Sequence, residues 1–256
     1  MQNTPAATVT FRLDPVSRRP IDWASAWPDA LALGVGLAVA RWAGWSAGDL
    51  IWSLWLSSLV VGYATIVWMI GHPVFMLTAL TWRSRNEPLN GSNSLIGFVA
   101  VVFIGAAFML AFFTVHFGGF HVVHAGFLLH FFPLDIPGVA NPALAGKEVY
   151  LEVFRRYWVF LPSAFLSHRA VFMATPLTLD AERWVKSLVK NSKKSKGFFL
   201  APYANVLRLH ALIFFFGFAA YAGLDNFAVY AVIYLAYFFP WRLVLRDKAS
   251  VRPVIE

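Results

Sequence analysis

The chain has 256 residues, of which 59% are hydrophobic and only 13% are charged, and its mean hydropathy is +0.62. A soluble domain carries about 25% charged residues, so this composition excludes a soluble globular protein and indicates a polytopic membrane protein. The absence of cysteine excludes disulfides, thiolate metal ligands and cysteine nucleophiles. We expect no nucleic-acid binding from the net charge of +8, because the basic residues gather in loops between apolar segments.

Six apolar segments follow a polar N-terminal segment over 1–28. An apolar stretch of about 20 residues is long enough to cross the hydrocarbon core, so each segment predicts a transmembrane helix. Their approximate bounds are 29–45, 51–69, 95–132, 157–176, 203–223 and 227–245. The segment from His72 to Asn93 is expected to be a loop. The predicted fold is therefore an all-α bundle of about six transmembrane helices over 29–245, followed by a tail over 246–256.

The third span lies within Ser94–Pro133, which has no Asp, Glu, Lys or Arg but holds four of the seven histidines. As one helix over 95–132 it would be roughly 55 Å long, against a hydrocarbon core of ~30 Å. We expect it either to extend beyond the core or to break at Gly118–Gly119, since glycine pairs are a known cause of kinks. A kink is also expected at Pro162 in the fourth span.

The basic residues predict the orientation of the chain. Fifteen lysines and arginines lie on the side of the two termini, and four lie on the opposite side. Cytoplasmic loops carry an excess of Lys and Arg, so both termini are expected in the cytoplasm. Within the basic loop over 177–201, residues 181–196 form an amphipathic segment with Trp184 on its apolar face. This segment is expected to bind the anionic headgroups of the lipid bilayer.

The histidines of the third span are its main chemical feature. Histidine inside hydrocarbon is costly and usually faces another helix, a partner or a water-filled cavity. On a continuous helix, His116, His124 and His130 lie within ~120° of one another, and His121 lies to one side. Neutral imidazole is the commonest metal ligand in proteins, so this cluster indicates a metal or haem site.

Two further histidines lie in other spans. His168 precedes one proline of the basic loop by eight residues and His210 follows another by eight, so both are expected at a similar depth. We predict one intramembrane site of four histidines, with His121 as a further candidate ligand: His116, His124, His168 and His210. Two separate sites remain an alternative, because His116 would lie far from the other spans on a straight third helix.

The predicted ligand set suits Zn, Cu or Fe, or one haem b. His116 and His130 are fourteen residues apart, the spacing found in cytochrome b-type bundles that stack two haems, but no second span repeats it. Hydrolysis assisted by a carboxylate is disfavoured, because no Asp or Glu is expected to be buried in a span. Three functions remain open: a metal- or haem-binding protein, including a membrane oxidoreductase or metalloenzyme; a metal or proton transporter or channel; and a structural or assembly protein.

Four segments resemble the motifs of one family in order and spacing. HFGGFHVVH at 116–124 is similar to His-Tyr-Gly-x-Phe-x-x-x-His, and PYANVLRLH at 202–210 is similar to Pro-Tyr-Gly-Arg-x-x-x-Leu-His. Ser167–His168 resembles Ser-His-Gly, and WSLWLSSLVVG in the second span resembles a Tyr-Trp-Leu-Glu-Asn segment. The chain thus resembles an uncharacterised bacterial multi-pass membrane family, a domain of unknown function.

This resemblance implies a bacterial inner-membrane location and functional roles for the four histidines of the predicted site, but it implies no activity. The chain departs from the motifs at Phe117, Arg169 and Asn205, and at Ser57, which stands where the family motif has Glu. A site that depends on that carboxylate would therefore have altered chemistry in this chain.

Overall fold

The computed structural model describes residues 9–12, 23–84, 92–136, 146–173, 201–224, 234–235, 238–239 and 252–255. Its helices are η1 (Trp23–Ala26), α1 (Trp27–Trp42), α2 (Ala47–Ser84), α3 (Ser92–Phe131), α4 (Lys147–Tyr157), η2 (Trp158–Phe160), α5 (Leu161–Met173) and α7 (Ala201–Tyr221), where η denotes a 3-10 helix. Two short strands, β1 (Val9–Arg12) and β2 (Arg252–Ile255), pair near the ends of the chain.

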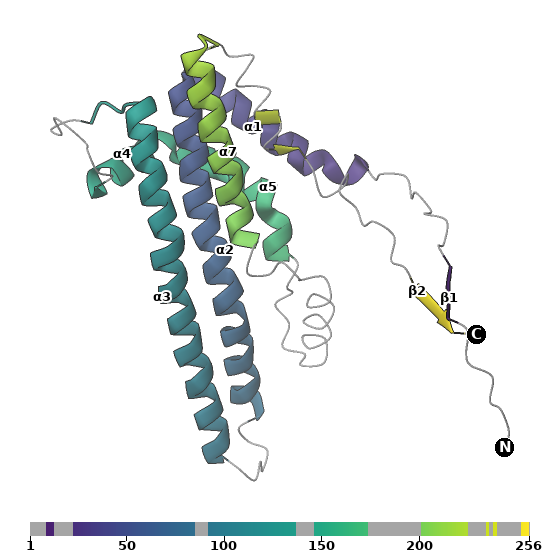
Figure 1. Ribbon diagram of the computed structural model, residues 1–256. Coiled ribbons are helices and arrows are strands. Elements are labelled where there is room, and N and C mark those ends of the chain that lie inside the picture. Colours follow the sequence, from purple (N-terminus) through teal and green to yellow (C-terminus); the bar gives the residue numbers. More distant parts are fainter. Residues whose placement is uncertain are drawn as a thin grey trace.

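Helices α2 and α3 form a long antiparallel hairpin (Figure 1). They contain 38 and 40 residues, which corresponds to roughly 57 and 60 Å at 1.5 Å per residue. Among the described residues, three helical segments are long and apolar enough to cross a membrane: Trp23–Trp42, Ala47–Trp82 and Val99–Phe131. The prediction of an all-α membrane bundle is confirmed, whereas the count of six spans stays a prediction because most of 227–245 lies outside the described residues.

The hairpin is more continuous than the sequence suggested. The predicted loop from His72 is wrong as far as Ser84, because α2 continues through Pro73. A proline inside a membrane helix is tolerated where neighbouring groups satisfy the freed backbone. The alternative of a break at Gly118–Gly119 is also excluded, since α3 is one helix through this pair.

The two long helices approach closely because a glycine on one faces an aromatic ring on the other. A Cβ atom added at Gly62 of α2 would lie 2.2 Å from Cζ of Phe117 on α3, so only glycine leaves room for this ring. Next to Gly62, the Tyr63 hydroxyl donates a hydrogen bond of 3.1 Å to the carbonyl of Thr114, about one turn before Phe117 on α3. Trp55 Nε1 donates to the His121 carbonyl at 3.3 Å. We call this line of contacts the α2–α3 seam.

The other helices pack around the upper half of α2 in Figure 1. Helix α7 lies against α2 and α3, while α5 packs between α1 and α2. The core at this end is built from large rings that include Trp52, Trp55 and Phe160, all of them buried. Trp52 Nε1 also donates to the Phe132 carbonyl at 3.0 Å, which ties the start of α2 to the end of α3.

The predicted kink at Pro162 corresponds to a change of helix type. The chain passes from α4 through η2 into α5, and Pro162 is the second residue of α5. Proline fits the first turn of a helix because its missing N–H would have no partner there. The described part of the predicted fourth span is therefore η2 and α5, preceded by a separate helix α4.

Strands β1 and β2 are antiparallel, with Val9 opposite Ile255 and Arg12 opposite Arg252. The ribbon lies apart from the long helices in Figure 1. It joins segments near the two ends of the chain.

The α2–α3 seam predicts a contrast between two glycines of α2. Gly62→Ala places a methyl group against the Phe117 ring, so we expect it to lower the thermal unfolding temperature in detergent, at a cost of ~1–3 kcal/mol for overpacking. Gly71 is the matched control, because a Cβ atom there meets nothing within 4 Å. Gly71→Ala should leave the unfolding temperature unchanged or raise it. Equal effects of the two variants would contradict the seam.

Candidate functional site

The structure brings together two of the predicted site residues, His124 of α3 and His210 of α7. His124 Nε2 lies 2.8 Å from His210 Nδ1 and 3.0 Å from His210 Nε2. The ring centroids are 4.0 Å apart and the rings are nearly perpendicular, at 78°. His124 is fully buried and His210 is half-buried. The contact joins positions 86 residues apart in the chain and is part of the packing of α7 against α3.

The other ring nitrogen of His124, Nδ1, is buried without a hydrogen-bond partner in the part of the chain that the structure describes. Among the described residues, His124 Nδ1 is the buried side-chain nitrogen or oxygen that has no hydrogen-bond partner. A buried polar atom without a partner costs about 1–3 kcal/mol, and such atoms often mark a site for an ion, a water or a ligand. His124 therefore has Nε2 facing the imidazole of His210 and Nδ1 without a hydrogen-bond partner within the described ranges.

His121 lies beside this pair, and its ring centroid is 6.1 Å from that of His124. Its Nδ1 is 3.0 Å from the Phe117 carbonyl oxygen, which can only accept, so Nδ1 carries the proton. In the neutral ring, Nε2 then has a lone pair, and it faces Ser58 Oγ at 3.4 Å. A histidine with one N–H fixed by a backbone carbonyl is the usual state of a metal ligand.

The remaining histidines have different surroundings. His116 is exposed, and its ring stacks on Phe112 with centroids 5.5 Å apart. His168 Nδ1 donates to the Ala164 carbonyl at 3.0 Å, which also leaves a lone pair on Nε2. His130 is exposed near the end of α3.

In the parts of the chain that the structure describes, no three His, Asp or Glu side chains are grouped so that they could hold a metal ion. The structure thus joins His124 to His210, with His121 alongside, and does not bring His116 or His168 into a group of that kind. The site of four histidines stays a prediction.

The expectation that no carboxylate is buried in a span is wrong. Asp29, in the first turn of α1, is only 4% exposed. Its two oxygens accept from Arg169 of α5, at 3.1 Å from Nη1 and 3.3 Å from Nη2. The ion pair forms because α1 and α5 pack together, a contact between residues 140 positions apart that periodicity cannot reveal. Arg169 is thus paired within the protein.

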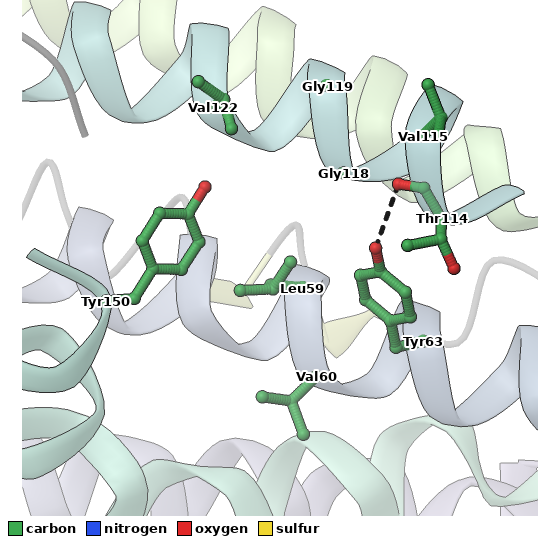
Figure 2. A pocket seen from close by; sticks show the side chains of 9 residues that line it. All are labelled: Leu59, Val60, Tyr63, Thr114, Val115, Gly118, Gly119, Val122 and Tyr150. Atoms are coloured by element: carbon green, nitrogen blue, oxygen red, sulfur yellow. Dashed lines mark hydrogen bonds between the residues drawn. The ribbon is translucent and has the colours of Figure 1, made fainter. Parts of the chain in front are cut away.

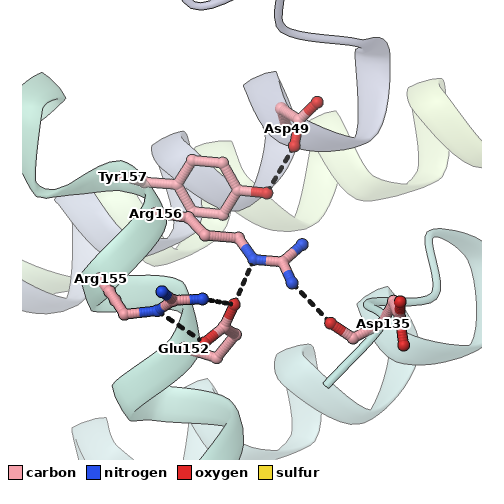
Figure 3. A network of polar contacts seen from close by, with 6 residues as sticks. All are labelled: Asp49, Asp135, Glu152, Arg155, Arg156 and Tyr157. Atoms are coloured by element: carbon pink, nitrogen blue, oxygen red, sulfur yellow. Dashed lines mark hydrogen bonds and ion pairs between the residues drawn. The ribbon is translucent and has the colours of Figure 1, made fainter. Parts of the chain in front are cut away.

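A second polar cluster joins α4 to the start of α2 (Figure 3). Glu152 accepts hydrogen bonds from Arg155 and Arg156, and Arg156 also donates to the Asp135 carbonyl. The Tyr157 hydroxyl donates to Asp49 Oδ1 at 2.6 Å. These charges satisfy one another, so we assign the cluster to anchoring α4 rather than to ligand binding.

Helix α4 was not predicted from the sequence, where residues 147–156 lie between the third and the fourth predicted spans. The signal was present, since Val149, Val153 and Tyr157 recur every four residues and are all buried on one face. The basic segment over 181–196 lies outside the described residues, so its binding to anionic lipid stays a prediction.

The fold and the buried histidine pair define a helical membrane protein with ionisable groups inside its bundle. Residues 17–250 match a family of unknown function, DUF6498. The chain belongs to this family, which agrees with the resemblance to an uncharacterised membrane family. Comparisons with curated proteins and with solved structures gave no significant match.

The α4 cluster predicts a dependence of stability on acid. Hydrogen bonds from Arg155 and then Arg156 lower the pKa of Glu152 from 4.5 to about 2. Because the folded-state pKa is depressed, this carboxylate stabilises the fold above pH 4.5, and the contribution is lost as the pH falls toward 2. Glu152→Gln should therefore show a smaller drop in unfolding temperature than wild type over this interval.

The control is Glu148→Gln, because Glu148 is exposed and lies 4.0 Å from Lys147. It should follow the wild-type pH profile in a thermal unfolding series. If Glu152→Gln and wild type lose stability in parallel, Glu152 is not the titrating group.

Proposed function

We propose that this protein binds a transition-metal ion inside the membrane through His124 and His210. The observation that carries the proposal is the contact of 2.8 Å between His124 Nε2 and His210 Nδ1, two ring nitrogens that face each other inside the bundle. Two imidazoles that face each other in a bundle offer lone pairs to one cation, and imidazole suits Zn, Cu and Fe.

The distances favour a non-haem ion over haem b. Metal–imidazole bonds are ~2.0–2.1 Å long, so two ligands on opposite sides of an iron place their nitrogens about 4 Å apart. A tetrahedral ion needs only about 3.3 Å between two ligand nitrogens, from the same bond length. The 2.8 Å contact is closer to the tetrahedral value. An ion held by two imidazoles keeps open positions for water or substrate, a feature that it would share with catalytic zinc sites and that is compatible with a metalloenzyme or an oxidoreductase.

Proton transfer is a second candidate, and the same contact supports it. Two neutral imidazoles at hydrogen-bond distance form an N–H···N link, and chains of ionisable groups within a membrane act as proton relays in transporters. The free Nδ1 of His124 would then be the next acceptor or donor along the path. A relay works without a bound metal, which distinguishes it from the first proposal.

We also propose a location in the bacterial inner membrane with both termini in the cytoplasm. Fifteen of the basic residues lie on the side of the termini in the six-span arrangement. The pairing of β1 with β2 supports a common side, because two hydrogen-bonded segments lie in the same compartment.

The orientation predicts the result of reporter fusions. A fusion after Glu256 should report the cytoplasm, and one inserted near Gly138 should report the opposite side. Identical reports from the two fusions would contradict the three spans expected between Gly138 and Glu256, and with them the six-span arrangement.

The metal proposal predicts that purified protein carries or can be loaded with Zn, Cu or Fe in stoichiometric amount, measured by elemental analysis. Loss of a ligand should weaken binding by about tenfold or more, as for other metal-site groups. We expect this loss for His124→Ala and for His210→Ala. If the site of four histidines forms, His116→Ala and His168→Ala should show a similar loss.

His72→Ala is the control, because His72 is a buried histidine of α2 that packs against Trp68, with centroids 5.3 Å apart. Its metal content should equal that of wild type. A Soret band in the optical spectrum would contradict a non-haem ion. Protein that holds no metal and cannot be loaded would contradict both metal and haem, and would leave the proton relay or helix packing as the role of the histidines.

A further inference from the structure

A lipid-facing hollow of about 660 Å³ lies along one side of the α2–α3 seam. Its lining comes from three helices: Leu59 and Tyr63 of α2, Gly118, Gly119 and Val122 of α3, and Tyr150 of α4. Figure 2 shows Leu59 and Tyr63 of α2 across the space from α3, with Tyr150 at one end. The histidine pair is not part of this lining, so the hollow is independent of the proposed metal site.

The floor of the hollow exists because two consecutive residues of α3 have no side chain. A Cβ atom added at Gly118 would lie 2.9 Å from the Tyr63 hydroxyl oxygen, so this glycine lets the tyrosine reach the α3 backbone. A Cβ atom added at Gly119 meets nothing within 4 Å, so this position opens into the hollow itself. A larger residue at 119 would therefore fill the space without a clash at its Cβ atom.

Two tyrosine hydroxyls line the hollow, and they differ in their hydrogen bonding. The Tyr63 hydroxyl is already engaged with the Thr114 carbonyl. The Tyr150 hydroxyl points into the space in Figure 2 and makes no hydrogen bond within the described part of the chain. Its ring is held against Trp55, with centroids 5.2 Å apart. Burial, together with nearby Tyr63, raises the pKa of Tyr150 above its usual value, so this hydroxyl stays a donor.

Helix α4 indicates the depth of Tyr150. It exposes the apolar residues Leu151 and Phe154 together with the charged Arg155, a pattern typical of a helix that lies in the membrane interface. From Tyr150 the hollow follows α3 away from α4, between Val122 and Thr114. These positions are eight residues apart, about 12 Å along the helix axis. The hollow therefore has a hydrogen-bond donor at interface depth and an apolar channel below it.

We propose that this hollow binds one membrane phospholipid, whose ester carbonyl accepts from the Tyr150 hydroxyl and whose acyl chain lies over Gly118 and Gly119. An ester carbonyl is an acceptor without a donor, and it lies at the junction of headgroup and hydrocarbon, where it can accept from a tyrosine hydroxyl on an interfacial helix. The acyl chain matches the apolar lining from Leu59 to Val122.

The test uses a phosphatidylglycerol that carries a photoreactive diazirine in the middle of one acyl chain. The full chain in detergent is titrated with this probe and irradiated, and labelled peptides are mapped by mass spectrometry. We expect saturable labelling of residues 114–122. Gly119→Leu should remove this labelling, whereas Gly105→Leu should not, because Gly105 is on the same helix, also meets nothing within 4 Å and lies outside the hollow.

Tyr150→Phe tests the headgroup contact without filling the hollow. Loss of this hydrogen bond should raise the half-saturating probe concentration about fivefold, which is roughly 1 kcal/mol at 1.4 kcal/mol per tenfold. Excess unlabelled phosphatidylglycerol should displace the probe, and an isoprenoid quinone, which has no ester, should not. Labelling that does not saturate and is spread evenly over α3, or displacement by the quinone alone, would overturn the proposal.

Discussion

The contact between Gly62 and Phe117 sets the distance between α2 and α3, and the rest of the bundle depends on it. A ring inserted over a glycine brings the two backbones close enough for the Tyr63 hydroxyl to reach the Thr114 carbonyl. Inside hydrocarbon, where no water competes, such contacts replace the hydrophobic effect as the force that holds helices together. Because both helices are long, one close approach fixes the direction of the whole hairpin.

The seam also determines which side chains of α3 face protein and which face lipid. On one side of α3, His121 and His124 turn toward α2 and α7 and are fully buried. On the other side, Gly118 and Gly119 leave a hollow that opens to the membrane. One helix thus presents a polar site to the interior and an apolar groove to the lipid. The unsatisfied Nδ1 of His124 is a cost within this arrangement, and a transferred proton would offset it.

The sequence predicted the membrane class, the approximate positions of the long spans and the histidine-rich centre, because apolar length and charge-free runs are strong local signals. It could not predict which histidines meet. Helix α3 is apolar on all sides, so no periodicity marks the face that receives α7, and the His124–His210 contact depends on packing across 86 residues. The Asp29–Arg169 pair was missed for the same reason. Helix α4 could have been found from its four-residue period, but it is short and charged and so does not stand out as an apolar span.

The central claim is that His124 and His210 together bind a metal ion. X-ray absorption at the metal edge tests this most directly, on wild-type protein and on His124→Ala loaded in the same way. We predict imidazole scattering from at least two nitrogens at ~2.0–2.1 Å in the wild type. This signal should lose one imidazole, or vanish with the metal, in the variant. An absorption spectrum without imidazole ligands, or one that is identical in wild type and variant, would contradict the claim.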